Sequence, residues 1–255
     1  MNLFDLTGKV ALVTGSTKGI GEAIVHRLAE HGANVVVSSR KADACEKVAA
    51  DINSSCGREA AIPIPCNINY KEQIENLVRE TRAKWGRIDV LICNAALNPY
   101  FGPQAGIPDE AFDKIMGANV RSNHWLCQLV LPEMAERKDG SIIIVSSIGG
   151  MKGSAVIGAY CISKAADFQL ARNIAVEYGP MNVRANCIAP GLIKTDFARA
   201  LWENPNILEY STSGTPLKRI GQPDEIAGAA VFLASKAGAF MTGQSIVIDG
   251  GSTIA

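Results

Sequence analysis

Two side chains with complementary chemistry stand four residues apart in the stretch AYCISKAADF, residues 159–168. This spacing places the phenol of Tyr160 and the ammonium of Lys164 on one face of a helix. A free tyrosine titrates at about pH 10 and carries protons poorly at neutral pH. A neighbouring ammonium favours the phenolate, which would bring the pKa of Tyr160 toward the range of general acid–base catalysis. In isolation, the same spacing is also typical of an amphipathic pair at the edge of a core.

Further polar residues accompany this pair in the sequence. Ser146 and Ser147 end the β-branched run SIIIVSS, and Tyr160 follows thirteen residues after Ser147. Open α/β sheets bind ligands at the carboxyl ends of their strands. Serines at a strand end are ordinarily turn formers, but beside Tyr160 and Lys164 they indicate a catalytic group. Asn119 lies in a predicted helix, where asparagine is disfavoured, so we expect it to make buried hydrogen bonds with a structural or catalytic purpose.

A glycine-rich turn near the N-terminus indicates a nucleotide site. In VTGSTKGIGEAI the glycines follow one predicted strand and open a predicted helix. Glycines in this context allow a tight turn and let the backbone approach a pyrophosphate. The spacing differs from the familiar Gly-x-Gly-x-x-Gly and, alone, is compatible with an ordinary turn. The predicted cofactor contacts here are Gly15, Ser16, Thr17, Lys18, Gly19, Ile20 and Gly21.

The end of the second predicted strand bears on the choice of cofactor. NAD-binding domains often place an acidic residue about 20 residues past the glycines, whereas this chain has Ser39 followed by Arg40. We expect Lys18 and Arg40 to lie where a 2′-phosphate would bind, with no carboxylate to repel it. A solvated arginine at a strand end is the alternative. The sequence therefore favours NADP(H) over NAD(H).

The fourth predicted strand ends in CNAA. Asn94 is followed by Ala95 and Ala96, whose small side chains leave room for a flat ring to pass close to the backbone. An asparagine that only turns the strand into a loop is also compatible with this motif.

Short β-branched runs and helical periodicity alternate along the whole chain, which predicts one doubly wound α/β domain, residues 1–255, with a seven-stranded parallel sheet and helices on both faces. Several runs are apolar throughout, as in strands covered on both faces. The predicted strands are Val10–Val13, Asn34–Ser38, Ala61–Ile64, Ile88–Cys93, Ser141–Ser146, Val183–Ile188 and Ser245–Ile248. The predicted helices lie near Ile20–His31, Ala42–Ile52, Lys71–Trp85, Asp109–Glu136, Gly158–Tyr178 and Pro223–Ala234.

Composition narrows the classes of partner. With 25 acidic and 25 basic residues, the chain offers no electrostatic reason to bind nucleic acid or an anionic membrane. Its seven cysteines form no Cys-x-x-Cys pair, so we expect reduced thiols and no metal site. We find no cleavable signal, no apolar run approaching 18 residues and no peroxisomal tripeptide in the closing GGSTIA. These features predict a cytoplasmic protein.

Taken together, these motifs resemble the short-chain dehydrogenase/reductase family over essentially the whole chain. TGSTKGIG is similar to the family's cofactor turn, CNAA to its Asn-Ala loop and MTGQSIVIDGG to its closing strand. APGLIKT, residues 189–195, resembles the family's Pro-Gly segment beside the nicotinamide. Asn119, Ser147, Tyr160 and Lys164 match its catalytic tetrad. NAALNPYFG, ALW and KRIGQP are similar to segments of NADP-dependent carbonyl and retinal reductases.

The resemblance implies reversible hydride transfer between a nicotinamide cofactor and a carbonyl or secondary alcohol. It implies that Tyr160 is the general acid/base, that Ser147 stabilises the reacting oxygen, that Lys164 holds the nicotinamide ribose and lowers the pKa of Tyr160, and that Asn119 positions a water. It extends the cofactor contacts to Asn67, Ile68, Pro190, Gly191, Ile193 and Thr195. We expect an apolar substrate pocket, with a loop insertion at about 192–215, formed by Leu97, Ser147, Ile157, Leu192, Phe197, Leu201 and Trp202.

The sequence departs from the family pattern in two places. The family commonly has Asn-Ala-Gly where this chain has Asn94-Ala95-Ala96, and an acidic residue where this chain has Asn67. Two alternatives remain at this point. One is an NAD-dependent dehydrogenase acting on a hydroxyacyl, sugar or steroid alcohol, and the other is a cofactor-binding regulatory protein without turnover. Similar helices and last strands form two-fold interfaces in relatives, so we expect a homotetramer.

Overall fold

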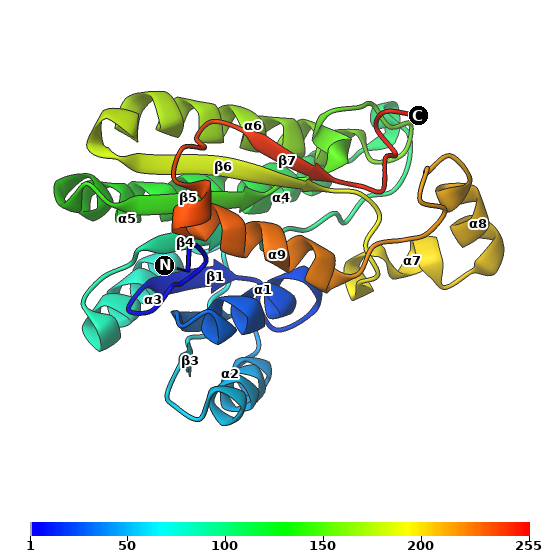
Figure 1. The fold of residues 1–255 in the computed structure, drawn as a ribbon. Coiled ribbons are helices and arrows are strands. Elements are labelled where there is room, and N and C mark those ends of the chain that lie inside the picture. Colours follow the sequence, from blue (N-terminus) through cyan, green and yellow to red (C-terminus); the bar gives the residue numbers. More distant parts are fainter. Residues whose placement is uncertain (1) are drawn as a thin grey trace.

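A parallel sheet of seven strands runs through the centre of the protein (Figure 1). The computed structural model describes residues 2–255. The strands lie in the order β3-β2-β1-β4-β5-β6-β7, and each neighbouring pair is parallel. They are β1 (Val10–Thr14), β2 (Asn34–Ser38), β3 (Ala61–Pro63), β4 (Val90–Cys93), β5 (Gly140–Val145), β6 (Val183–Pro190) and β7 (Ser245–Ile248). The predicted single doubly wound domain with a seven-stranded parallel sheet is confirmed.

Helices connect the strands. They are α1 (Gly19–Glu30), α2 (Ala42–Cys56), α3 (Lys71–Trp85), α4 (Asp109–Met116), α5 (Ser122–Arg137), α6 (Gly158–Tyr178), α7 (Arg199–Trp202), α8 (Pro205–Ser213) and α9 (Pro223–Ala234). Short 3₁₀ turns lie at Gln104–Gly106, Ile148–Gly150, Gly179–Met181, Asp196–Ala198 and Lys236–Gly238. Within residues 2–255, no helix combines the length and the apolar character needed to cross a membrane.

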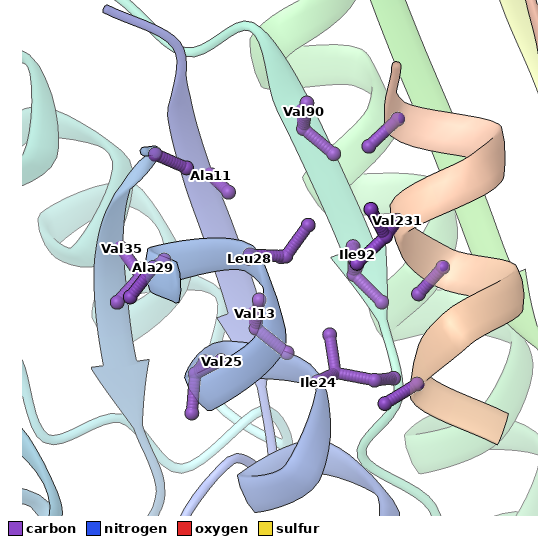
Figure 2. Packing of buried hydrophobic residues seen from close by; sticks show 14 of the residues in the cluster. Ala11, Val13, Ile24, Val25, Leu28, Ala29, Val35, Val90, Ile92 and Val231 are labelled. Atoms are coloured by element: carbon purple, nitrogen blue, oxygen red, sulfur yellow. The ribbon is translucent and has the colours of Figure 1, made fainter. Parts of the chain in front are cut away.

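Each face of the sheet has its own hydrophobic core, because successive residues of a strand point to opposite faces. On one face Val13 of β1 packs with Ile24 and Leu28 of α1 and with Val231 of α9 (Figure 2). On the other face Leu12 belongs to a cluster that includes residues of α3, α5 and α6. Both faces of the central strands are therefore buried, which explains their continuous apolar runs.

The order in which the chain adds strands to the sheet reverses at β1: β2 and β3 lie on one side of it, and β4 to β7 lie on the other. The strands β1 and β4 are neighbours, with Val13 opposite Ile92, although β2 and β3 separate them in the sequence. Their carboxyl ends, Thr14 and Cys93, therefore meet at one edge of the sheet. Such a reversal point is where open α/β sheets bind their ligands.

The single helix predicted at Asp109–Glu136 is interrupted in the structure. A π-helical turn, Gly117–Arg121, separates α4 from α5. Such a turn accommodates an extra residue and is frequently found at functional sites. Periodicity did not reveal it, because both flanking segments are regular helices. The interruption contains Asn119, the residue that the sequence marked as unusual in a helix.

The segment after β6 is more ordered than the loop predicted at 192–215. It contains α7 and α8, which project beyond the carboxyl ends of β6 and β7 (Figure 1). The start of α8 carries a recognisable signal: Asn204 accepts a hydrogen bond from the backbone of Asn206, and Pro205 occupies the first turn. Asparagine caps and first-turn prolines are typical of helix N-termini.

Candidate active site

The four predicted catalytic residues converge at the carboxyl edge of the sheet. Ser147 follows β5, Asn119 lies in the π turn, and Tyr160 and Lys164 stand one turn apart on α6. Hydrogen bonds join these elements: Ser146 donates to the carbonyl of Lys164 at 2.8 Å, and Lys164 Nζ donates to the carbonyl of β5 residue 145 at 2.9 Å. The end of α6 that carries both side chains is thereby fixed to the end of β5.

Tyr160 lies beside Ser147 and also packs against the ring of Phe197. The ring of Phe197 is 5.9 Å from that of Tyr160, and Lys164 Nζ is 5.8 Å from the centroid of the Tyr160 ring. Burial raises the pKa of Tyr160, while the charge on Lys164 and hydrogen bonding with Ser147 lower it. Lys164 therefore acts in the predicted direction, but burial outweighs it and the pKa lies above the ordinary value. The expected net decrease is wrong for this structure.

Lys164 is the largest fully buried polar side chain of the site, with 2 % of its side chain exposed. Besides its bond to the β5 carbonyl, it forms an ion pair with Asp167, Nζ to Oδ2 at 3.1 Å. Burial opposes the charge on Lys164, yet Asp167 and Tyr160 together raise its pKa above the ordinary value. Sequence reasoning missed Asp167. A carboxylate three residues after a lysine on a largely apolar helix was the available signal.

Asn119 is fully buried, and its carboxamide makes three hydrogen bonds to protein partners. Its Oδ1 accepts from the backbone N–H of Leu97 at 2.9 Å, and its Nδ2 donates to the Leu97 carbonyl and to Ser163 Oγ, both at 3.0 Å. Ser163 donates in turn to the carbonyl of Tyr160 at 2.7 Å. The predicted buried hydrogen bonding of Asn119 is confirmed. It joins the loop after β4 to α6.

The glycine turn has the shape of a phosphate cradle. Gly15 and Gly19 adopt φ values of 66° and 59°, which favour glycine. A Cβ on Gly21 would lie 2.3 Å from the carbonyl oxygen of Gly15, so only glycine fits there. Lys18, at the cap of α1, makes no side-chain hydrogen bond to the first turn. The backbone N–H groups at the helix start, together with its dipole, are suited to a pyrophosphate.

Asn94 holds this turn in place rather than only ending a strand. Its Nδ2 donates to the carbonyls of Thr14 and Gly15, both at 3.0 Å. The backbone N–H of Ala95 bonds Thr14 Oγ1 at 3.2 Å. Ser16 is fully buried and bonded to β1 and β2, so its side chain shapes the turn from within. The other predicted residues of these two segments, Thr17, Ile20 and Ala96, are partly exposed at the same edge.

The residues predicted to select the cofactor lie at the end of β2. Arg40 is exposed and, among residues 2–255, makes no hydrogen bond or ion pair. Ser39 is half-buried and contacts Lys41 and Cys45. Lys18 is engaged elsewhere, since its Nζ lies 3.3 Å from a carboxylate oxygen of Asp196. The neighbouring Asn67 and Ile68, after β3, are half-buried.

The segment 189–195 folds back toward the glycine turn. A Cβ on Gly19 would lie 3.0 Å from Thr195 Cγ2, so these two predicted segments are brought together. Gly191 is just as confined, because a Cβ there would lie 2.7 Å from Asp249 Cα. Pro190 ends β6, and Ile193 is buried and bridges to Gly221.

A cavity of about 470 Å³ lies between the 192–215 segment and the end of β7, and only two of the seven predicted pocket residues line it. Leu192 and Leu201 line it, together with Ile148, Leu217 and polar residues that include Lys152 and Arg219. Five predicted residues are not part of its lining: Phe197 packs on Tyr160, Trp202 donates to the Thr195 carbonyl, Leu97 bonds Asn119, Ile157 precedes α6 and Ser147 follows β5.

The arrangement defines a class of enzyme. A family model described as Enoyl-(Acyl carrier protein) reductase matches residues 15–253. The chain is 44% identical over 247 residues to Dehydrogenase/reductase SDR family member 4 of Bos taurus, covering 97% of this chain and 88% of that protein. The chain belongs to the short-chain dehydrogenase/reductase family. It is thus an oxidoreductase of a family that binds nicotinamide cofactors and acts on small molecules.

Solved structures of relatives share the fold closely. A gluconate 5-dehydrogenase from Burkholderia cenocepacia, in complex with NADP and tartrate, has a TM-score of 0.94 at 31% identity, covering 99% of this chain and 98% of that one. A 7α-hydroxysteroid dehydrogenase, complexed with NADH and 7-oxo glycochenodeoxycholic acid, has a TM-score of 0.93 at 36% identity, covering 98% and 97%. The two relatives were solved with different cofactors and with different small molecules.

Proposed function

We propose that this protein is an NADP(H)-dependent oxidoreductase that interconverts a carbonyl compound with an apolar body and the corresponding secondary alcohol. One observation carries the proposal: Tyr160 lies beside Ser147, above the buried ammonium of Lys164, at the sheet edge where the glycine turn opens. A phenol, a hydroxyl and a cation together suit proton transfer to an oxygen that develops negative charge.

The residues present fit a nicotinamide dinucleotide. The backbone at Gly15–Gly21 and the uncapped start of α1 would hold the pyrophosphate. Thr195 lies against the glycine turn, and Pro190 at the end of β6 and Gly191 after it lead into the same segment, so this segment would border the nicotinamide. When bound, the cofactor supplies or accepts the hydride.

The chain's own residues handle the oxygen and the proton. In reduction, Tyr160 donates its phenolic proton to the substrate oxygen, and it takes the proton back in oxidation. Ser147 donates a hydrogen bond to the same oxygen and stabilises the charge on it. Lys164 holds a positive charge 5.8 Å from the centre of the Tyr160 ring and favours the phenolate after proton transfer. Phe197 packs beside the phenol and limits the access of water to it.

The preference for NADP(H) is supported by the end of β2. Arg40 is exposed and unpaired among the described residues, and Ser39 stands where a carboxylate would repel a 2′-phosphate. An arginine can grip a phosphate with two parallel hydrogen bonds. The comparison structures include both an NADP complex and an NADH complex, so this local chemistry is what favours the phosphorylated cofactor.

We also propose a cytoplasmic homotetramer. Members of this family are typically oligomeric, and closed symmetric assemblies are the common outcome. Val176 on α6 is 81 % exposed and Phe240, between α9 and β7, is fully exposed. Both apolar side chains lie near the elements expected to form the two interfaces. The cytoplasmic location rests on the sequence features alone.

The test is a panel of carbonyl compounds, namely aryl ketones, α-diketones, retinal, steroids and acetoacetyl thioesters, each assayed with NADPH and with NADH. We expect NADPH oxidation with at least one apolar ketone and much weaker activity with NADH. Efficient turnover with NADH and a hydroxyacyl, sugar or steroid alcohol would support the NAD-dependent alternative instead. Cofactor binding without turnover of any compound would contradict an enzymatic role.

A further inference from the structure

A buried carboxylate lies directly against the ammonium of Lys164. Asp167, on the next turn of α6, accepts from Lys164 Nζ through Oδ2 at 3.1 Å, and its side chain is 0% exposed. Its Oδ1 accepts from Asn123 Nδ2 on α5 at 3.0 Å. The Asn123 amide also donates to the carbonyl of Asn119 at 2.7 Å. Burial raises the pKa of Asp167, whereas Lys164 and the hydrogen bond from Asn123 lower it. Both carboxylate oxygens face N–H donors, which is the arrangement of an ionised carboxylate.

No second carboxylate pairs with Lys164 among residues 2–255. A hydrogen bond with Cys127 and burial raise the pKa of the Cys93 thiol, and burial raises that of Cys187, so both thiols are neutral at physiological pH. Asp167 is therefore the counter-charge of Lys164. The other titratable groups that interact with the pair are Tyr160 on α6, Cys93 on β4 and Cys187 on β6, while Cys127 on α5 and the exposed Arg172 on α6 act on these cysteines.

The negative charge acts on both members of the catalytic pair. Asp167 favours the protonated form of Lys164, which burial alone would disfavour. It also favours the protonated form of Tyr160, because the phenolate would carry the same sign of charge. The ion pair thus offsets part of the pull that the lysine charge exerts on the phenol. This accounts for part of the upward shift in the pKa of Tyr160.

We propose that Asp167 is a positioning residue, which fixes the Lys164 ammonium beneath Tyr160 and sets the pH at which the pair gives up its proton. Asn123 holds the carboxylate in place from α5. The inference rests on the proposed function, since it assigns Asp167 a role in proton transfer to the substrate. Asp167 acts through Lys164 and is not itself expected to touch substrate.

The direction of the effect does not depend on which group loses its proton first. Tyr160 and Lys164 interact, so their protons leave in steps that belong to the pair. A negative charge nearby raises the pH of each step, and its removal lowers the first one. Carbonyl reduction needs Tyr160 protonated and Lys164 charged. In either case, therefore, the alkaline decline of the reduction rate moves to lower pH without Asp167.

The experiment compares kcat/KM for carbonyl reduction against pH in the unmodified enzyme and in Asp167→Asn. We expect the midpoint of the alkaline decline to fall by at least about one pH unit, because at an effective dielectric of about 20 a unit charge within roughly 10 Å shifts a pKa by that much or more. Asp167→Glu keeps the charge and should move the midpoint less. Asp89→Asn is the matched control, because Asp89 is a buried, ion-paired carboxylate at the opposite edge of the sheet. That variant should leave the midpoint unchanged.

A purely structural role would reduce stability or rate at every pH without moving the midpoint. An unmoved midpoint in folded Asp167→Asn, or an equal shift in Asp89→Asn, overturns the inference. If circular dichroism shows that Asp167→Asn does not fold, Asp167→Ser, which also removes the charge, replaces it in the same pH comparison. An unmodified enzyme that reduces no carbonyl compound would remove the proposed function and this inference with it, whereas an active enzyme with an unmoved midpoint removes the inference alone.

Discussion

Lys18 and Asp196 form an ion pair, Nζ to Oδ2 at 3.3 Å, that links the glycine turn to the segment after β6. Both side chains are substantially exposed, with 68 % and 46 % of their side-chain surface accessible. Arg199 pairs with the same carboxylate. Hydrogen bonds from Arg199 and Lys18 lower the pKa of Asp196, so its charge is kept at physiological pH. Lys18 must therefore leave or share Asp196 when it meets a cofactor phosphate.

Replacing Asp196 by Asn should free Lys18 for the 2′-phosphate. Exposed ion pairs contribute roughly 0.2–1 kcal/mol, so the KM for NADPH should fall by about 1.4- to 5-fold. The KM for NADH should stay the same, since NADH has no phosphate at that position. Steady-state kinetics with both cofactors would check this. An equal change in KM for NADPH and NADH would show that the substitution acts by altering the segment after β6 and not by freeing Lys18 for the 2′-phosphate.

Arg40→Ala tests the cofactor preference. Hydrogen bonds to charged groups contribute about 1.5–3 kcal/mol, so kcat/KM with NADPH should fall by at least ~10-fold, while kcat/KM with NADH should barely change. An equal loss with both cofactors would contradict the phosphate role of Arg40.

Ser39→Asp should reverse the preference. A carboxylate at this position repels the 2′-phosphate and can accept hydrogen bonds from the ribose hydroxyls of NADH. We expect kcat/KM with NADH to exceed kcat/KM with NADPH in this variant, measured in the same assay. A variant that still prefers NADPH would show that Ser39 does not face the ribose.

Tyr160→Phe keeps the ring but removes the proton donor. Turnover should fall by ~10² or more, because general acid catalysis contributes about that factor. NADPH should still bind, as measured by quenching of protein fluorescence, since the glycine turn is untouched. Turnover close to that of the unmodified enzyme would show that another group supplies the proton.

Gly21→Ala should destroy the cofactor turn. The added Cβ would lie 2.3 Å from the carbonyl oxygen of Gly15, and this part of the turn cannot move freely because Asn94 bonds the carbonyls of Thr14 and Gly15. We expect loss of NADPH binding and a lower melting temperature. Gly228→Ala is the matched control: a Cβ there meets nothing within 4 Å in α9. That variant should gain about 0.5–1 kcal/mol of stability and bind NADPH normally.

Most of the fold was predictable from the sequence because its signals are local. Apolar runs and 3.6-residue periodicity identified the seven strands and the segments of α1 to α6 and α9, with α4 and α5 predicted as one helix. Some ends are displaced by a few residues, as at β4, which begins at Val90 rather than Ile88. The π turn at 117–121 was not predictable, because one extra residue between two regular helices leaves no compositional trace. The short α7 and α8 went unrecognised because the segment was interpreted as a loop.

The candidate site was predictable where a residue type is required by chemistry at a fixed spacing, as for Tyr160 and Lys164. The site residues were harder to predict where their role depends on a contact between elements far apart in the sequence. Asp167 and Asn123 lie 44 positions apart in the chain, and only packing of α5 against α6 reveals that they bond each other. The net pKa of Tyr160 depends in the same way on burial, which the sequence does not give.

The π turn makes the chain sensitive to its length at this point. One residue of an α-helix corresponds to about 100° of rotation about the axis. Deleting a single residue between positions 117 and 121 would turn α5 by roughly that angle relative to α4 and swing the amide of Asn123 away from Asp167. A substitution in this turn alters one side chain, whereas a deletion would rotate the whole of α5 relative to Lys164. Insertions and deletions here should therefore be tolerated far less well than point changes.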